Sequence, residues 1–304
     1  CSIISGLSPD FENDANYESR IKETVEQLNS GQLTYENAPQ FLAKFPSILF
    51  GVETAFLDLK NGGKGLVFQN DFSSGKQKIP INGLIWMGSE SFMLEQIDQK
   101  VEQGFSTLKM KVGAIDFDTE FKILKTIRSN FPASEMTLRV DANGAFDEHT
   151  ALKVLQQLSE LEIHSMEQPI QPNQWDAIQR LCQATPTPIA LDEELIGITE
   201  IDQKIQLLET IQPQFIILKP TLHGGISGCR EWISIAEKRN IPWWMTSALE
   251  SNIGLNAICQ FTAEFNNELP QGLGTGSLYV DNIDSDLVVE NGYIFRLKTL
   301  ESRL

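Results

Sequence analysis

Thr107-Leu108-Lys109-Met110-Lys111-Val112-Gly113 is the stretch that decides the fold of this sequence. An apolar run carries two lysines two residues apart and ends at a glycine. Side chains at i and i+2 of a β-strand point the same way, so Lys109 and Lys111 would share one face. A lysine beside a second cation has a lowered pKa, which suits a base, but an exposed strand with solvated charges fits the same residues. The rest of the chain must therefore supply the partners that decide between the two interpretations.

From Ile81 onward, short apolar runs of this kind alternate with amphipathic stretches. The runs are 84–87, 105–111, 137–141, 163–167, 188–192, 215–219, 242–246 and a weak one near Leu273. Their ends recur roughly every 25 to 30 residues, the length of one strand, one helix and two short loops. About eight such units predict a closed parallel barrel rather than an open doubly wound sheet, with no clear helix in the eighth unit. No Gly-x-Gly-x-x-Gly follows the first run, which disfavours a dinucleotide-binding sheet.

Residues 1 to about 80 lack this repeat. They predict helices at Tyr17–Leu28 and Ser47–Leu59, each followed by Asn and Gly, and a linker at 77–80. Residues 279–304 are expected to leave the barrel and join the N-terminal domain. Cys1-Ser2-Ile3-Ile4 resembles the end of a strand, so we expect the natural chain to begin earlier.

Composition excludes several function classes. The net charge of −17 argues against nucleic acid and against an anionic membrane surface. No apolar run approaches the roughly 20 residues that span a bilayer, so a cytoplasmic protein is expected. Cysteines 1, 182, 229 and 259 form no C-x-x-C pair and are predicted to be small buried residues or free thiols. The oligomeric state is not indicated.

Carboxylates end three successive runs. Asp141, Glu167 and Asp192 each stand at the C-terminal end of a predicted strand, and in a parallel barrel these ends form the face where active sites are built. Three converging carboxylates would repel one another without a cation. All-oxygen ligation with positions left open for substrate and water suits Mg²⁺, with Mn²⁺ as a substitute.

The sixth run ends in the same way, at Lys219-Pro220. Counted around the barrel, Lys109 and Lys111 lie on one side of the carboxylates and Lys219 on the other. This arrangement suits removal of a proton next to a carboxylate, because a metal can take the developing enediolate charge while a lysine takes the proton. A small-molecule carboxylate is therefore the expected partner. Any one of these residues alone also fits a loop charge or a helix N-cap.

Together these residues resemble the enolase superfamily, and within it the o-succinylbenzoate synthase family. The matching segments are 109–111 (Lys-Met-Lys), 141–143 (Asp-Ala-Asn), 167–169 (Glu-Gln-Pro), 192–193 (Asp-Glu), 218–220 (Leu-Lys-Pro), 246–255 and 271–276. The resemblance covers about Ile81 to Tyr279. It implies an α/β fold: a modified TIM barrel, (β/α)7β, at 81–278, with an α+β capping domain formed by 1–80 and the tail 279–304.

The resemblance also implies a reaction. The three strand-end carboxylates would be the magnesium ligands and Lys111 the base. Lys109 would tune Lys111 and contact the substrate carboxylate, and Lys219 would stabilise the intermediate as a cation on its other face. The reaction would be syn-dehydration of 2-succinyl-6-hydroxy-2,4-cyclohexadiene-1-carboxylate, in which one lysine serves first as base and then as acid.

Further residues are weaker candidates. Asn143 would hold Asp141 or the substrate, although a plain turn residue fits as well. Ser247 and Ser251 precede an apolar helix, and Ser251 or Asn252 is expected as its N-cap. The functional alternative is that the free N–H groups of this helix start receive the succinyl carboxylate. Gly274 would let substrate approach the backbone, or simply turn the chain. Glu193 would support the metal or face solvent. The histidines at 149, 164 and 223 match no ligand spacing and are expected to be structural.

Two other functions remain open. Two lysines on opposite faces of a carbon acid also suit an N-acylamino acid racemase or a dipeptide epimerase of the same superfamily. The eighth run has no Asp-x-Asp to hold a substrate ammonium, which disfavours the dipeptide epimerase. An alternative of a different class is a non-catalytic barrel that binds a ligand, and retention of every lysine and carboxylate argues against it.

Overall fold

The computed structural model describes residues 3–297. From β2 onward, every strand of the larger sheet is followed by a helix: β2 (Gly83–Ile85), α4 (Glu90–Glu102), β3 (Thr107–Lys111), α5 (Phe117–Asn130), β4 (Thr137–Asp141), α6 (Glu148–Ser159), β5 (Ser165–Glu167), α7 (Trp175–Ala184), β6 (Ile189–Leu191), α8 (Ile201–Ile211), β7 (Phe215–Leu218), α9 (Gly225–Glu237), β8 (Trp243–Met245) and α10 (Asn252–Thr262). A short 3-10 turn, η1 (Glu193–Leu195), lies between β6 and α8. The first seven predicted runs therefore each contain a strand.

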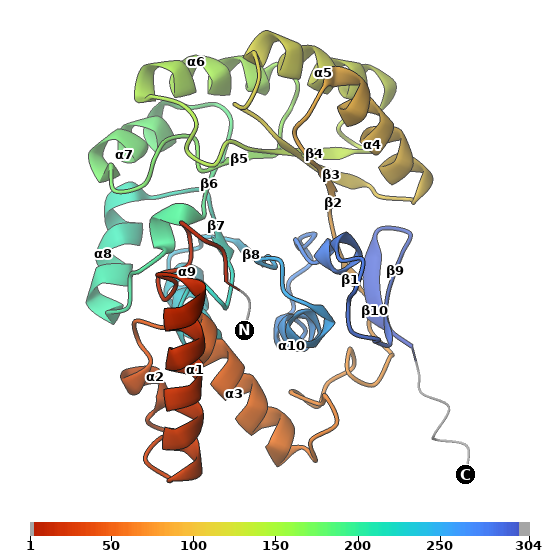
Figure 1. The fold of residues 1–304 in the computed structure, drawn as a ribbon. Coiled ribbons are helices and arrows are strands. Elements are labelled where there is room, and N and C mark those ends of the chain that lie inside the picture. Colours follow the sequence, from red (N-terminus) through yellow and green to blue (C-terminus); the bar gives the residue numbers. More distant parts are fainter. Residues whose placement is uncertain (1–2, 298–304) are drawn as a thin grey trace.

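The strands form one seven-stranded parallel sheet in the order β2-β3-β4-β5-β6-β7-β8, with helices α4 to α9 around its outside (Figure 1). The weak run near Leu273 closes the ring through two isolated parallel bridges, Thr246↔Gly272 and Ile81↔Gln271. Only glycine fits at 272, because a Cβ there would lie 2.4 Å from Thr246 Oγ1. Within residues 271–297 the only helical segment is the 3-10 turn η2 (Thr275–Leu278). The expected modified barrel, with no helix in its eighth unit, is confirmed.

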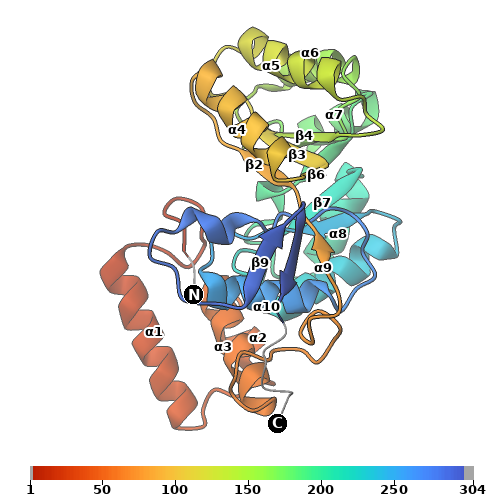
Figure 2. The same ribbon diagram turned by 90° about the vertical axis from the view of Figure 1, so that its right-hand side faces the viewer.

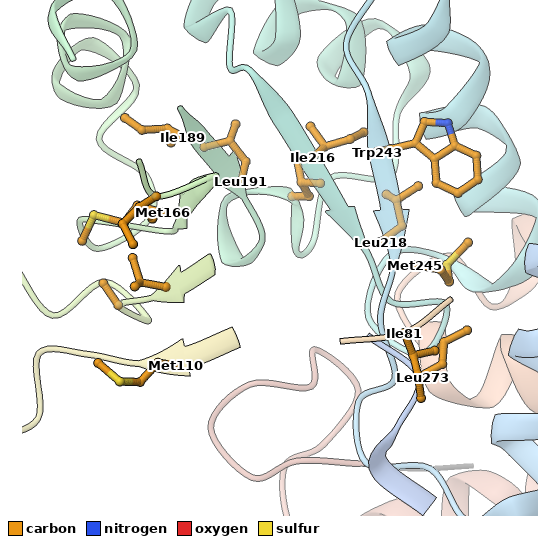
Figure 3. Close-up of a cluster of buried hydrophobic side chains, with 14 of the residues drawn as sticks. Ile81, Met110, Met166, Ile189, Leu191, Ile216, Leu218, Trp243, Met245 and Leu273 are labelled. Atoms are coloured by element: carbon orange, nitrogen blue, oxygen red, sulfur yellow. The ribbon is translucent and has the colours of Figure 1, made fainter. Parts of the chain in front are cut away.

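Strand alternation separates an apolar layer outside the barrel from an inner layer that combines apolar side chains with polar ones at the C-terminal ends of the strands. Outward side chains such as Met166, Leu191 and Leu218 pack in the cluster between the strands and the helices (Figure 3). Inside the barrel a small cluster includes Ile217 and Trp244, which precede Lys219 and Thr246 by two residues and so share their face. The polar side chains at the C-terminal ends of the strands therefore rest on an apolar filling.

The N-terminal residues form α1 (Asp14–Asn29), α2 (Ala38–Phe41) and α3 (Pro46–Lys60), which confirms the two predicted helices. They enclose a separate cluster that includes Tyr17, Leu33 and Ile48. Helix α3 packs against α9, where buried Glu53 accepts hydrogen bonds from the backbone N–H groups of Ile226 (2.5 Å) and Ser227 (3.1 Å). In Figure 2, helices α1 to α3 lie away from α4 to α7, at the other end of the molecule.

The C-terminal residues form a hairpin of β9 (Leu287–Glu290) and β10 (Tyr293–Arg296). Strand β10 pairs antiparallel with β1 (Ile79–Pro80), in the segment that the sequence indicated as a linker. The strand end expected at the N-terminus is not found at Ile3 and Ile4, while residues 1–2 and 298–304 lie outside the described part.

Two expectations from composition can be compared with the described residues. No helix within 3–297 has the length and apolar character needed to cross a membrane. Cys182, Cys229 and Cys259 are free and buried, as expected, whereas Cys1 lies outside the described residues.

Candidate active site

The predicted lysines and carboxylates meet at the C-terminal ends of the strands. Lys111 at the end of β3 is in register with Asp141 at the end of β4, and Asp141 is in register with Glu167 at the end of β5. Asp192 and Lys219 directly follow β6 and β7. One face of the barrel thus carries every predicted metal ligand and every predicted catalytic lysine.

The lysines pair with the carboxylates directly. Lys109 Nζ lies 2.9 Å from Asp141 Oδ2 and 2.5 Å from Glu167 Oε2, so its ammonium bridges the two. Lys111 Nζ lies 2.7 Å from the same Asp141 oxygen. On the other side of the group, Lys219 Nζ donates to Asp192 Oδ2. Lys109 and Lys219 therefore stand on opposite sides of the carboxylates, as the strand order predicted.

Burial and neighbouring charge shift the ionisation of this cluster. Burial alone would lower the pKa of Lys109 and of Lys219, but the adjoining carboxylates outweigh it and raise the pKa of both. The pKa of Asp141 is lowered, because the two neighbouring lysines outweigh the effect of burial. The pKa of Glu167 is raised well above its usual range by burial and by the negative charge of Asp141. The cluster is thus short of positive charge at Glu167.

A divalent cation fits this shortage. As the side chains lie, no three Asp, Glu, His or Cys residues within 3–297 are arranged around a common ion, since ammonium groups take the inward oxygens. At the site, two buried oxygens of the predicted ligands nevertheless have no hydrogen-bond partner, Glu167 Oε1 and Asp192 Oδ1, and neither has Glu193 Oε2 beside them. Oxygen-only donors of this kind suit Mg²⁺. Ligation by the predicted trio requires the lysines to release the carboxylates.

Asn143 and Glu193 extend the cluster beyond the strand ends. Lys111 Nζ also donates to Asn143 Oδ1 (2.6 Å), and Asn143 Nδ2 donates to Glu193 Oε1 (2.8 Å). The Asn143 backbone N–H donates to Asp141 Oδ1 (3.0 Å). Burial and the charge of Asp192 raise the pKa of Glu193 to about 7. Asn143 therefore contacts Asp141, as the sequence suggested, and Glu193 lies beside the cluster.

Two neutral side chains that the sequence analysis did not assign to the site, Gln168 and His223, support the charged ones. Gln168 Oε1 accepts the backbone N–H groups of Asp192 (3.2 Å) and Glu194 (3.1 Å). His223 Nδ1 accepts the Lys219 backbone N–H (2.9 Å), and burial lowers the pKa of His223 to about 3, so the ring is neutral. His223 is structural, as expected, yet it holds a site residue. Gln168 directly follows Glu167 in the sequence, which was the one available signal for it.

Glu250 connects the loops that follow β7 and β8 at the C-terminal ends of the strands. Its carboxylate accepts the hydroxyls of Thr221 (2.7 Å) and Ser247 (2.6 Å). Thr275 Oγ1 donates in turn to Ser247 Oγ (2.7 Å). The hydroxyl proton of Ser247, a predicted substrate contact, is thus directed at Glu250. Burial of a carboxylate beside serine and threonine hydroxyls has no sequence signature, so the importance of Glu250 was missed.

A cavity of about 290 Å³ lies over the site. Its wall includes the three lysines together with Asn143, Glu193, Ser247 and Gly274, and its remaining wall includes Ile4, Leu7, Trp86 and Leu278. Ser251 is not on this wall. It stands at the N-cap position of α10 and lines a different pocket, shared with Phe50 and Gly51 of α3. The structure therefore gathers all the predicted site residues except Ser251.

Comparisons with known proteins agree with this fold. Residues 93–298 match the family model "Enolase C-terminal domain-like". The chain is 46% identical over 280 residues to o-succinylbenzoate synthase of Desulfotalea psychrophila, covering 92% of this chain and 74% of that protein. The crystal structure of MenC from the same organism superposes with a TM-score of 0.85 at 41% identity, covering 97% of this chain and 89% of that one.

A more distant relative has a different activity. L-Ala-D/L-Glu epimerase of Bacillus subtilis is 29% identical over 183 residues, which cover 60% of this chain and 49% of that protein. The family model spans more than half of the chain, and the D. psychrophila synthase matches over most of both lengths. This chain therefore belongs to the enolase superfamily and, within it, to the o-succinylbenzoate synthase family.

Proposed function

We propose that this chain is a hydro-lyase that removes water from 2-succinyl-6-hydroxy-2,4-cyclohexadiene-1-carboxylate to form o-succinylbenzoate. The observation that carries the proposal is the pairing of three lysines with three carboxylates on one barrel face, beside a cavity of about 290 Å³ whose wall includes the three lysines. The family membership and the 46% identity to a synthase support the same reaction.

In this proposal Lys111 is the base. Its Nζ, as the free amine, takes the ring proton next to the substrate carboxylate, and the electron pair left on carbon moves into the carboxylate. The pair then returns to form the ring double bond as the C–O bond to the hydroxyl breaks. Lys111 gives its proton to the leaving hydroxide, so that one molecule of water departs from the same face of the ring.

The two buried lysines act as fixed cations. As the side chains lie in the structure, the adjoining carboxylates raise the pKa of Lys109 and of Lys219, which favours the ammonium form of both. Lys109 attracts the substrate carboxylate, while Lys219 stabilises the negative charge of the intermediate from the opposite side. Neither residue has to exchange a proton during the reaction.

Asp141, Glu167 and Asp192 would hold Mg²⁺, with Mn²⁺ as a substitute. When bound, the cation supplies positive charge next to the substrate carboxylate, where the enediolate develops. The unpartnered oxygens of Glu167 and Asp192 support this assignment.

We also propose the arrangement of the chain around the site. Residues 81–278 form the barrel, and the described parts of 1–80 and 279–304 form a cap, in keeping with Ile4 and Leu7 at the cavity wall. The remaining residues of these two segments, 1–2 and 298–304, lie outside the described part. The substrate is a small carboxylate. A cytoplasmic location is consistent with the free thiols of the described cysteines.

Racemisation of N-acylamino acids is the second candidate. One observation in its favour is that lysines lie on both sides of the carboxylates. Another is the similarity to an N-succinylamino acid racemase of Thermus thermophilus, at 28% identity over 204 residues. A racemase needs both lysines to exchange protons, whereas the dehydratase needs only one.

The proposal is tested by incubating the purified protein with the cyclohexadiene substrate and measuring o-succinylbenzoate by chromatography. We expect product with Mg²⁺, none after EDTA, and recovery when Mg²⁺ is restored. Circular dichroism checks that the chelated protein stays folded. Absence of product from the folded, Mg²⁺-supplied protein would contradict the proposal.

A further inference from the structure

The side-chain amide of Asn143 is held between a cation and an anion. Its oxygen accepts from Lys111 Nζ (2.6 Å) and its nitrogen donates to Glu193 Oε1 (2.8 Å). The three residues come from the ends of β3, β4 and β6, and all of them line the catalytic cavity. They form one hydrogen-bonded chain across the face of the barrel.

The direction of this chain is fixed by chemistry. An ammonium only donates, and the carboxyl group of Glu193 offers an acceptor oxygen in either protonation state, so the amide turns its oxygen to Lys111 and its N–H₂ group to Glu193. If Glu193 were replaced by a residue without an acceptor, the N–H₂ group of Asn143 would lose its partner, and the amide could turn once Lys111 is in its amine form. Glu193 therefore keeps the oxygen of Asn143 facing the base when Lys111 is not an ammonium.

This contact gains importance when a cation is bound. Lys111 has two anchors, Asp141 Oδ2 and Asn143 Oδ1. Asp141 is one of the proposed metal ligands, so its oxygens are then engaged elsewhere. The Asn143 oxygen is the anchor that remains to hold Lys111 Nζ in place.

Glu193 itself stands on a fixed backbone. It opens the 3-10 turn η1, and Gln168 Oε1 accepts the N–H groups of the residues on either side, Asp192 and Glu194. The Gln168 side chain is fully buried and also donates to the carbonyl of Ile170 (3.0 Å). Gln168 thus holds the backbone on both sides of Glu193, the residue whose carboxyl group orients Asn143.

We propose that Glu193 is a positioning residue that acts through Asn143 to hold the Lys111 ammonium or amine facing the substrate. The assignment rests on the proposed function in taking Lys111 as the base. It gives Glu193 a role in placing the base rather than in binding the cation.

The test uses a reciprocal exchange. Glu193→Ala removes the acceptor, and Glu193→Gln keeps one. Asn143→Asp sets a second carboxylate against Glu193, and aspartate tolerates the positive φ of 46° at this position. The double variant Asn143→Asp/Glu193→Gln restores a donor opposite an acceptor and keeps the same total charge. Glu160→Gln, on an exposed side chain of α6's C-terminus, is the matched control.

The expected result is a loss in kcat with little change in KM. Removing a supporting residue of a metal or catalytic site typically costs about 10- to 100-fold, so Glu193→Ala is expected near the lower figure and Asn143→Asp near the upper. The double variant should recover at least about tenfold over Asn143→Asp, since the pair acts as a unit. Unchanged kcat in Glu193→Ala, or no recovery in the double variant, would overturn the proposal.

A second readout separates positioning from metal binding. Mg²⁺ affinity, measured by titration calorimetry, should stay close to wild type in Glu193→Ala. A fall in affinity that parallels the fall in kcat would mean that Glu193 acts on the cation, and would overturn the proposal.

A third readout does not depend on the substrate. Asn143→Asp should lower the melting temperature, and adding Glu193→Gln should restore most of it; no restoration would contradict the contact itself. Wild-type protein without turnover would count against the proposed function alone, and the melting-temperature cycle would still decide whether the two residues are coupled.

Discussion

At the residue scale, the site is a set of charges that compensate one another. The sequence could predict which residues take part, because each ends a strand on the face where parallel barrels build active sites. It could not predict the pairing, in which Lys109 bridges Asp141 and Glu167. That pairing depends on side-chain reach across three strands, which spacing along the chain does not encode. The expected effect of Lys109 on Lys111 stays a prediction.

The role of Lys111 leads to a direct prediction. Lys111→Ala should lower kcat by at least about 1000-fold, since it removes both the proton acceptor and the proton donor. Steady-state kinetics measures the loss, and circular dichroism should show an unchanged fold. Lys153→Ala, at an exposed position of α6, is the control and should retain full activity. Substantial residual turnover by the alanine variant at 111 would remove this lysine as the base.

The assignment of Asp192 predicts a change in metal affinity. Asp192→Asn should weaken Mg²⁺ binding by more than about tenfold, because it removes an anionic ligand and frees Lys219 to repel the cation. Titration calorimetry measures the affinity. Asp176→Asn, at an exposed position of α7, is the control. Equal affinities for the two variants would exclude Asp192 as a ligand.

At the element scale, the alternation of strands and helices was predictable and the contacts between distant elements were not. Apolar runs and their spacing indicate the strands, since burial on both faces demands continuous apolar sequence. The placement of Ser251 illustrates the limit. It begins α10 as expected, but packing of α3 beside that helix start gives Ser251 a pocket separate from the lysines. Contacts between residues about 200 positions apart leave no local signal.

The junction of α3 and α9 provides a test at this scale. Buried Glu53 accepts two backbone N–H groups at the start of α9. Glu53→Gln replaces one acceptor with a donor facing an N–H group, so the free energy of unfolding should fall by about 1–3 kcal/mol. Urea unfolding measures this free energy. Glu26→Gln, at an exposed position of α1, is the control. Equal stability of the two variants would show that this carboxylate does not secure the helix.

At the scale of the whole molecule, a neutral histidine links stability to pH. Burial, with a further contribution from the charge of Arg139, lowers the pKa of His164 to about 4. The folded-state pKa of His164 lies below the unfolded value of about 6.5. The contribution of His164 to the free energy of unfolding is therefore complete above about pH 6.5 and is lost as the pH falls toward about 4.

His164→Phe should reduce this dependence. Phenylalanine preserves the ring contact with Phe215 (4.8 Å between centroids) and does not titrate. Urea midpoints at about pH 7.5 and about pH 5 should therefore differ less in the variant than in wild type. The same difference in both proteins would mean that His164 titrates in the folded state as it does in the unfolded chain.

The complete molecule also shapes the cavity over the site. The cavity is lined by barrel residues together with Ile4 and Leu7 of the N-terminal segment. Its shape therefore could not be derived from the barrel motifs alone. The motifs indicate the chemistry, which dehydratases and racemases of the superfamily share.

The central claim is therefore tested most directly by comparing kcat/KM for the cyclohexadiene substrate with kcat/KM for N-acylamino acids and dipeptides, using one Mg²⁺-loaded preparation. We predict a clear preference for the cyclohexadiene, with o-succinylbenzoate as the product. A higher kcat/KM for any N-acylamino acid or dipeptide would contradict the account and assign the chain to racemisation or epimerisation instead.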